Sequence, residues 1–525
     1  LMNPLTYVVV NLGIIGILVL AECCRRAVGV PILCVASVFI LYAFIGRGMS
    51  LQLVVYNVFY TTNGIIGTPI SVCSTYIALF LMFGAFLEAT GVANFFIDCA
   101  NALVGWASGG PAKVAVVSSA LCGMVSGSSV GNTVTTGSVT IPMMKKTGYP
   151  GEFAGAVEAA ASTGGQIMPP IMGAAAFIMA EMTGFEYSKI IVRAILPAFL
   201  YFLGIFLGVH FKAKKLGLKG LPREELPKWG KLLPKIYLLL PLVLLVYMIV
   251  SGQTMAKSAI YATIAAIAVS LINKDDRMTP TKFVNGLENG GKNCISIGIA
   301  CGIAGIISVC ITMTGLGGKL ITYVVSLSNG HLIIALFLTM ICCIVLGMGV
   351  PTTANYIIMA STCAPILING MGMHVLAANM FVFYFGIVAD ITPPVALAAY
   401  AGSAIAKAPP MKTAFNATRL AIAAFIIPYI FAFNNAMIFV GDDVTVWSVA
   451  SITISATLGM LSIASGLMGY LIHDLKWISR IALIAGGLLM IIPGTVSDLA
   501  GFAVLAAIFV LQTIENKKEK KAASV

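Results

Sequence analysis

Long apolar stretches with few charges recur along this chain, and they restrict its fold more than any other feature. Clear examples are residues 190–211, 256–272, 295–313 and 449–472. A helix of about 20 apolar residues crosses the hydrocarbon core of a bilayer, and lipid requires each spanning segment to satisfy its own backbone hydrogen bonds. Only 10% of the 525 residues are charged, against about 25% in soluble domains. The sequence therefore predicts an all-α polytopic membrane protein.

Basic residues gather beside the apolar stretches. Residues 212–235 carry Lys or Arg at eight positions and acidic residues only at Glu224 and Glu225. Cytoplasmic loops of membrane proteins are enriched in Lys and Arg, so we expect this segment to be a cytoplasmic loop. The net charge of +12 has the same explanation, and no nucleic-acid partner is predicted.

One pattern occurs twice, at a constant separation of 224 residues. The matching landmarks are Thr90-Gly91 with Thr314-Gly315, Gly123-Met124 with Gly347-Met348, and Pro169-Pro170 with Pro393-Pro394. Three landmarks at one offset indicate a duplication, and duplicated bundles with interrupted helices are typical of secondary transporters. We expect a first repeat over 47–211 with a hairpin at 112–146, the basic loop 212–235, connecting helices over 236–289, a second repeat over 290–440 with a hairpin at 331–370, and a C-terminal helical extension with a basic tail over 441–525.

Each repeat contains an apolar segment with a polar centre, which predicts a re-entrant helical hairpin. The turns are expected at residues 126–133 and 349–355. Lys113, Lys145 and Lys146 flank the first hairpin, whereas the mouth of the second has no Lys or Arg. The distribution of positive charge then places the hairpins on opposite sides of the membrane, so the repeats are predicted to be inverted.

Each repeat also contains a helix that is interrupted in mid-span, at residues 164–170 and 389–394. Gly and Pro break helices and free backbone carbonyls, which are hard oxygen ligands suited to Na⁺. We expect two cation sites, each between a hairpin tip and the break of its repeat, with a substrate between them. The alternative is that the Gly, Pro, Ser and Thr residues only permit close packing and kinks.

Three carboxylates within the apolar segments are candidates for function, because charge at membrane depth is costly. Glu158 and Glu181 lie in one predicted span, and Asp390 lies at the second break. For Glu158 the alternatives are a structural hydrogen bond or a tie to Lys113 or Arg193.

No pattern typical of an enzyme or an ATP-driven pump is found. Residues 127–131 read Gly-x-Ser-x-Gly, but no preceding strand or His partner is predicted. No Walker motif indicates ATP binding. The 12 Cys are scattered and the 4 His lie far apart, which predicts neither a disulfide framework nor a His-based metal site.

Several runs around the first hairpin and break are similar to a known family. They are Gly109–Val117, Ser126–Ser129, Thr140–Lys146 and Phe153–Pro170. They resemble the large membrane subunit of tripartite ATP-independent periplasmic (TRAP) transporters, and they are most similar to fused permeases that work with a binding protein of the TAXI type. The resemblance extends over about residues 46–440. On this comparison, residues 1–46 resemble a remnant of the small subunit.

The resemblance implies a Na⁺-coupled symporter of the bacterial inner membrane that works by an elevator mechanism without ATP. It implies import of a small organic acid, a C4 or C5 carboxylate such as 2-oxoglutarate or glutamate, delivered by a soluble periplasmic binding protein of the TAXI type. The alternatives are a carrier coupled to protons through Glu158, a channel built on the same bundle, and an intramembrane enzyme.

The resemblance also implies the ligands of the two Na⁺ sites. The first set is Ser126, Gly127, Ser128, Asn132, Gly165 and Pro169, and the second is Gly347, Val350, Thr352, Thr353, Asp390 and Thr392. The residues expected at the substrate are Ser129, Gln166, Asn355 and Glu158.

Overall fold

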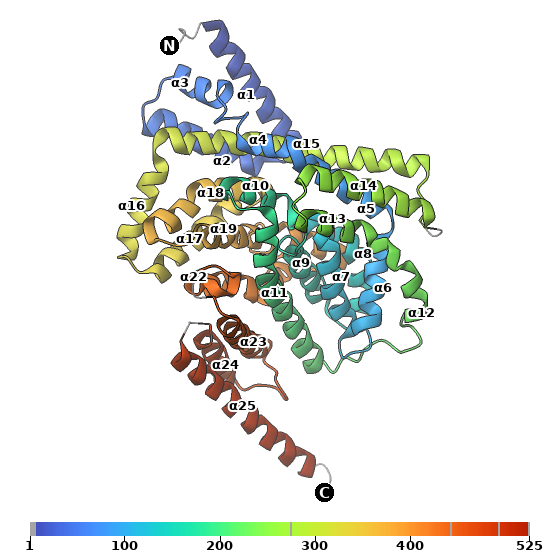
Figure 1. Cartoon of the computed structure of the whole chain (residues 1–525). Helices are drawn as coiled ribbons and strands as arrows, with labels where there is room; N and C mark the ends of the chain where they lie inside the picture. Colours follow the sequence, from blue (N-terminus) through green and yellow to red (C-terminus); the bar gives the residue numbers. More distant parts are fainter. Residues whose placement is uncertain (1–6, 274–275, 442–443, 492–493, 523–525) are drawn as a thin grey trace. The chain divides into compact units, whose positions relative to one another are not determined.

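The computed structural model describes residues 7–273, 276–441, 444–491 and 494–522, and this part of the chain is almost entirely helical (Figure 1). Helices account for 80% of the structure. Nine helices in the described ranges are long and apolar enough to cross a membrane: Tyr7–Ala27, Thr68–Ala89, Tyr187–Lys215, Trp229–Val250, Met255–Ile272, Pro280–Thr314, Pro410–Phe433, Val446–Met468 and Thr495–Asn516. The predicted class, an all-α polytopic membrane protein, is confirmed. The side chains of the predicted basic tail, from residue 517 onward, lie outside the described residues.

The chain forms two compact units. Unit 1 consists of residues 1–92, 170–190 and 235–390, and unit 2 of residues 93–169, 191–234 and 391–525. Two of the boundaries, after residues 169 and 390, fall within the two predicted helix breaks. The chain therefore passes from one unit to the other at each interruption.

Unit 2 is organised around α9, which is buried on all sides. Helices α7, α8, α20 and α21 all pack against α9, and every residue of α9 from Phe153 to Gly165 is buried. Small residues permit this close packing. A Cβ atom on Gly155, for example, would lie 2.8 Å from the carbonyl oxygen of Gly402 in α20. The helices are α7 (Gly110–Ser126), α8 (Ser129–Lys146), α9 (Gly151–Gly165), α20 (Leu397–Ala406) and α21 (Pro410–Leu420).

The remaining helices of unit 2 include a C-terminal group with its own small core. In this group α24 packs against both α23 and α25, around Leu475, Leu483 and Met490. The helices are α6 (Val92–Val104), α11 (Tyr187–Lys215, which begins in unit 1), α12 (Trp229–Leu232), α22 (Ile422–Phe433), η6 (Asn435–Ile438), α23 (Val446–Met468), α24 (Trp477–Leu489) and α25 (Thr495–Ala522).

Unit 1 contains the second hairpin and the longest helix, α15. Helix α15 packs along α5, α18, α2 and α1. Its helices are α1 (Tyr7–Ala27), α2 (Val30–Leu41), η1 (Tyr42–Gly46), α3 (Leu51–Val55), η2 (Tyr56–Tyr60), α4 (Thr68–Val72), η3 (Cys73–Ile77), α5 (Ala78–Ala89), α10 (Gly173–Thr183), η4 (Leu233–Leu239, which begins in unit 2), α13 (Leu240–Val250), α14 (Met255–Ile272), α15 (Pro280–Thr314), α16 (Leu316–Ser328), α17 (Leu332–Gly347), α18 (Thr352–Thr362), η5 (Ile366–Gly370) and α19 (Val375–Val388).

Each unit combines helices from both halves of the duplication. In unit 2, α20 follows the second break and packs against α8 and α9 of the first repeat. In unit 1, α10 follows the first break and packs against α18 and α19 of the second repeat. The helix that resumes after each break therefore joins the hairpin of the other repeat. The duplication predicted matching breaks, but it did not predict this exchange.

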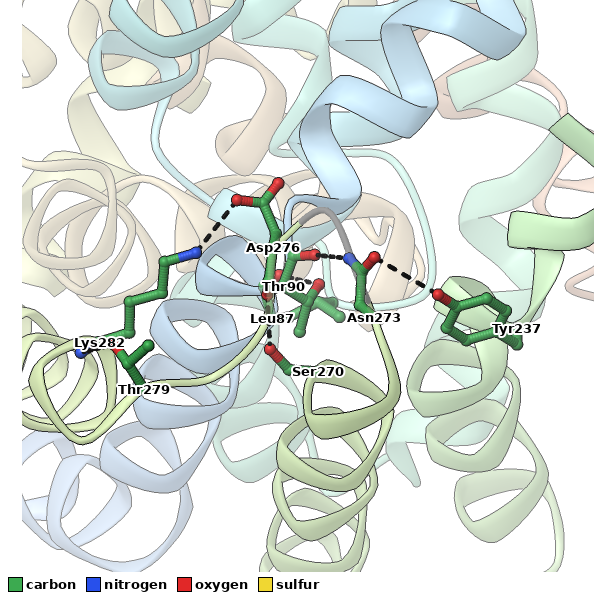
Figure 2. Close-up of polar contacts among 8 residues, drawn as sticks. All are labelled: Leu87, Thr90, Tyr237, Ser270, Asn273, Asp276, Thr279 and Lys282. Carbon is green, nitrogen blue, oxygen red and sulfur yellow. Dashed lines mark hydrogen bonds and ion pairs between the residues drawn. The ribbon is translucent and has the colours of Figure 1, made fainter. Parts of the chain in front are cut away.

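The repeated Thr-Gly landmark marks the end of a helix in both repeats. After α5, the carbonyl of Thr90 accepts a hydrogen bond from Asn273 Nδ2 at 3.1 Å, and the hydroxyl of Tyr237 approaches Asn273 Oδ1 at 3.4 Å (Figure 2). At the end of α15, the carbonyl of Thr314 accepts from Arg47 Nε at 2.7 Å. Side chains from distant segments thus satisfy carbonyls that every helix end leaves free.

Glycine follows the threonine in each pair because the backbone turns into the left-handed region. The φ angles are +79° at Gly91 and +63° at Gly315, a conformation that favours glycine. A Cβ atom on Gly91 would also lie 2.3 Å from Oδ2 of Asp276, whose other carboxylate oxygen pairs with Lys282 at 3.1 Å (Figure 2). The landmark is therefore duplicated because both helices need the same corner.

Candidate functional site

The first hairpin turns over two residues between α7 and α8. Gly127 ends α7 with a φ of +60°. Ser128 begins α8 as its N-cap, because its Oγ accepts a hydrogen bond from the backbone N–H of Gly131 at 3.2 Å. Helix capping therefore explains both residues, which were predicted as ligands.

The second hairpin turns over four residues between α17 and α18. Helix α17 ends at Gly347, and Gly349 has a φ of +71°. Pro351 precedes the first helical residue, Thr352. Prolines suit helix starts because the first backbone N–H groups have no partner within the helix.

Glycines let the first hairpin approach the end of α9 very closely. A Cβ atom on Gly123 would lie 2.4 Å from the Cα of Gly165, and one on Gly165 would lie 2.5 Å from the Cα of Gly123. Real side chains do not reach such distances, so the two backbones are in direct contact. This contact holds the hairpin against the last turn before the first break.

The side chain of Asn132 lies buried at this contact. It is 1% exposed, and its Nδ2 donates to the carbonyl of Ser119 at 3.1 Å. Its Oδ1 atom is buried and has no hydrogen-bond partner among the described residues. The amide therefore presents one unpaired, hard oxygen beside the hairpin tip.

The second repeat has the same arrangement inside unit 1. Asn355, in the first turn of α18, is 1% exposed and donates through Nδ2 to the carbonyl of Gly386 at 2.9 Å. A Cβ atom on Gly347 would lie 2.5 Å from this Nδ2 and 2.9 Å from the Cβ of Ala389. The Oδ1 of Asn355 is also buried without a partner in the described chain.

The two arrangements are related by the duplication. Gly347 lies 224 residues after Gly123, and Ala389 lies 224 residues after Gly165. In each unit an asparagine from the second arm of a hairpin therefore wedges between the first arm and the interrupted helix. An unsatisfied buried acceptor costs about 1–3 kcal/mol, so its appearance at both related positions indicates a ligand rather than chance.

The structure places the other predicted ligands unevenly. Ser126 and Ser128 are exposed, whereas Val350, Thr353 and Asp390 are buried. The first set lies entirely in unit 2; in the second set, Thr392 belongs to unit 2 and the other five residues to unit 1. Of the residues predicted at the substrate, Ser129 and Gln166 are each 2% exposed.

Side-chain hydroxyls cap several of the carbonyls that the breaks release. At the first break, the hydroxyl of Tyr187 lies 2.8 Å from the carbonyl oxygen of Pro170 and 2.5 Å from that of Ile171. At the second, Thr418 donates to the carbonyl of Ile391 at 2.9 Å, and Tyr400 donates to that of Pro394. These carbonyls thus already have one hydrogen-bond donor each, which reduces their availability to a cation.

Glu158 lies in a pocket of hydroxyl groups inside unit 2. Its carboxylate is fully buried and accepts hydrogen bonds from Ser119 on α7, from Thr136 and Thr140 on α8, and from Ser162 on α9 at 3.3 Å. A Cβ atom on Gly137 would lie 2.9 Å from the Cγ of Glu158, so glycine makes room for this side chain.

The predicted tie between Glu158 and Lys113 is not present. Lys113 is 4% exposed; its Nζ lies 3.1 Å from Nδ1 of His210 and 5.1 Å from the centre of the Phe206 ring. Glu181 lies in unit 1, where it accepts a hydrogen bond from Tyr76 at 3.1 Å. The structural alternative for Glu158, a set of hydrogen bonds, is the one that the structure bears out.

Comparison with known protein families gives the context for this geometry. Residues 15–442 match the family described as "Tripartite ATP-independent periplasmic transporter, DctM component". The chain belongs to this family. The family-level resemblance to TRAP permeases is therefore confirmed, and the chain is a multi-pass membrane protein whose relatives are transporters.

Individual TRAP permeases are similar to this chain at moderate identity. The C4-dicarboxylate TRAP transporter large permease protein DctM of Pseudomonas aeruginosa is 26% identical over 339 residues, covering 63% of this chain and 77% of the relative. DctM of Vibrio cholerae is 31% identical over 157 residues, covering 30% of this chain and 34% of the relative. The sialic acid TRAP transporter large permease protein SiaM of Vibrio cholerae is 20% identical over 335 residues, with coverage of 63% and 77%.

Within this TRAP permease, sequence reasoning missed some residues of the site and misjudged others. Asn355 was predicted at the substrate, but its place matches that of Asn132. Tyr187, Tyr400 and Thr418 were not predicted at all. The only signal for them was the presence of hydroxyl side chains within about 30 residues of the breaks, which is too common a feature to single them out.

Proposed function

We propose that this chain is the permease of a TRAP transporter that imports a small carboxylate together with Na⁺. The similarity to C4-dicarboxylate permeases supports a C4 or C5 dicarboxylate, such as 2-oxoglutarate or glutamate, as the substrate class. A soluble periplasmic binding protein, of the TAXI type, delivers the substrate. The protein resides in the inner membrane and works by an elevator mechanism, with inverted repeats and re-entrant hairpins.

The pair of unpaired asparagine oxygens is the observation that supports Na⁺ coupling most strongly. Each oxygen is buried beside a hairpin tip, where leaving it without a partner costs about 1–3 kcal/mol. Na⁺ prefers hard, uncharged oxygens of this kind, and binding at Asn132 and Asn355 removes both penalties. Hydroxyl and carbonyl oxygens of the predicted ligand sets complete the coordination.

The substrate carboxylate is proposed to bind near the start of α8. The first backbone N–H groups of a helix have no partner within it and attract anions. Ser129, at this helix start, and Gln166, just after α9, are buried and polar, as a specific carboxylate site requires. Asn355 is now assigned to the second cation rather than to the substrate.

The test compares two buried asparagines of unit 1. Asn355→Ala removes the unpaired oxygen, whereas Asn379→Ala removes an amide whose two ends are already bonded, to Tyr356 at 2.8 Å and to the carbonyl of Val375 at 2.9 Å. Both variants lose one buried amide, so their stability falls similarly. Only Asn355→Ala is expected to raise the half-saturating Na⁺ concentration for uptake, by about tenfold, the factor for about 1.4 kcal/mol.

The assay is uptake of labelled 2-oxoglutarate or glutamate into liposomes that contain the purified chain, with its binding protein outside. An inward Na⁺ gradient should drive uptake, and a choline gradient should not. Na⁺-independent uptake, or an equal Na⁺ response in the Asn355 and Asn379 variants, would disprove the proposed cation role.

A proton-coupled carrier is the second candidate, and the pocket around Glu158 favours it. All polar contacts of this carboxylate in the described chain are with uncharged hydroxyls. These hydroxyls already occupy its oxygens, so a proton fits there without rearrangement, whereas a metal ion must displace them. Glu158→Gln keeps the shape of the side chain and removes proton exchange. Loss of uptake driven by a pH gradient in Glu158→Gln, with Na⁺ having no effect on the wild type, would favour this candidate over Na⁺ coupling.

A further inference from the structure

Four cationic side chains converge at one end of unit 2. Lys212 and Lys215 lie in the last turn of α11, Arg419 near the end of α21, and Arg480 in the first turn of α24. Arg419 lies within electrostatic range of both Lys212 and Arg480. Lys215 and Arg480 flank the same glycine, since a Cβ atom on Gly469 would lie 3.3 Å from Lys215 Nζ and 3.2 Å from Arg480 Cζ.

Two of these cations are already used to stabilise the end of α23. Arg480 donates to the carbonyls of Gly466 at 2.9 Å and Leu467 at 3.1 Å. Lys215 donates to the carbonyl of Gly469 at 3.4 Å and pairs with Asp474 at 3.0 Å. They therefore have a structural role, and they add positive charge to the surroundings of the other two.

The other two cations have no such partner. Arg419 makes no hydrogen bond or ion pair with any residue that the structure describes, and it lies ten residues into the candidate span Pro410–Phe433. The same holds for Lys212, whose Nζ only faces the ring of Phe153, 5.6 Å from its centre. An arginine within a membrane span needs an anionic or polar partner. The donors of Lys212 and Arg419 are therefore available to an anion from outside the chain.

The surface beside these donors is apolar and exposed. On α21, Met411 and Phe415 precede Arg419 at intervals of four residues, so all three lie on one face, and both are exposed. On α24, Trp477 stacks on the guanidinium of Arg480 at 4.9 Å and is 69% exposed, and Ile478 and Ile481 are exposed beside it. A cationic group next to exposed apolar helix faces matches a molecule with an anionic head and apolar chains.

We propose that Lys212 and Arg419 bind the phosphate headgroup of an anionic phospholipid. Its acyl chains lie along the exposed faces of α21 and α24. The guanidinium of Arg419 binds two phosphate oxygens side by side, and the ammonium of Lys212 adds a point charge. Arg480 and Lys215 raise the positive potential that selects an anionic lipid over a zwitterionic one.

The test measures thermal unfolding of the full-length purified chain in dodecyl maltoside as dioleoyl phosphatidylglycerol is added. The wild type should be stabilised in a saturable manner, because a ligand that binds only the folded state raises the unfolding temperature. Dioleoyl phosphatidylcholine, which has the same acyl chains, and inorganic phosphate, which has none, should stabilise it much less. Equal stabilisation by phosphatidylcholine would show that only the acyl chains bind, and equal stabilisation by inorganic phosphate would show a simple anion site; either result overturns the proposal.

Variants separate the specific contact from general charge. Arg419→Gln should raise the half-saturating phosphatidylglycerol concentration by about tenfold, as expected for losing a charge-assisted hydrogen bond. Lys412→Gln removes the same charge from another exposed position of α21 and should change it less than about twofold. An equal effect of the two variants would overturn the assignment. If Arg419→Gln does not fold, as judged by gel filtration, Lys212→Gln provides the same comparison.

Discussion

Replacing Gly123 by alanine is predicted to weaken the first cation site by separating two backbones. The added Cβ atom would lie 2.4 Å from the Cα of Gly165 and 3.3 Å from Nδ2 of Asn132, whereas an ordinary contact measures 3.4 Å or more. Helices α7 and α9 must therefore move apart by about 1 Å at the hairpin tip. Overpacking of this kind costs about 1–3 kcal/mol.

The same displacement exceeds the tolerance of a binding site, which needs its ligands placed within about 0.5 Å. We therefore expect Gly123→Ala to raise the half-saturating Na⁺ concentration for uptake by about tenfold or more. It should also lower the unfolding temperature of the purified protein in detergent.

A matched control is available on α15, where a Cβ atom on Gly291 would meet no atom within 4 Å. Gly291→Ala should leave Na⁺ affinity unchanged and increase stability by up to about 1 kcal/mol, because alanine favours helix more than glycine does. The reasoning is refuted if Gly123→Ala binds Na⁺ and unfolds as Gly291→Ala does.

Three further substitutions test other contacts through the thermal unfolding of the purified protein. Gly91→Ala should destabilise it by about 2 kcal/mol, because the new Cβ would occupy a left-handed residue 2.3 Å from the Asp276 carboxylate; an unchanged midpoint would show that this corner is not tightly packed. Tyr187→Phe should cost about 1–2 kcal/mol by leaving the carbonyls of the first break without their hydroxyl, and a neutral result would mean that water replaces it. Lys113→Met should be neutral or stabilising by about 1 kcal/mol, because it removes a buried charge whose partner is His210 rather than a carboxylate; a large loss of stability would show that this charge is needed.

The sequence was sufficient to predict the class, the family and the positions of the interruptions. Apolar length and composition reveal membrane helices directly, and Gly and Pro reveal where those helices end. The constant offset between Gly123 and Gly347 also predicted equivalent hairpin arms, and both glycines do lie at closely packed helix contacts. These features depend on local chemistry, which one sequence records.

Contacts between distant segments could not be predicted in the same way. The hydroxyls that surround Glu158 come from three helices, and Ser119 is 39 residues away from it in the chain. Their spacing along α8 is compatible with many other roles, so only the packed structure shows that they meet. For the same reason, sequence reasoning separated Asn132 from Asn355, although the two occupy equivalent places in their units.

Counting the Na⁺ ions bound to the purified protein tests the central claim most directly. Equilibrium binding of radioactive Na⁺ should give two ions per chain for the wild type. Asn132→Ala and Asn355→Ala should each retain one ion at the concentration that saturates the wild type. A wild type that binds no Na⁺, or variants that both bind as many ions as the wild type, would contradict the claim that these two asparagine oxygens coordinate the coupling ions.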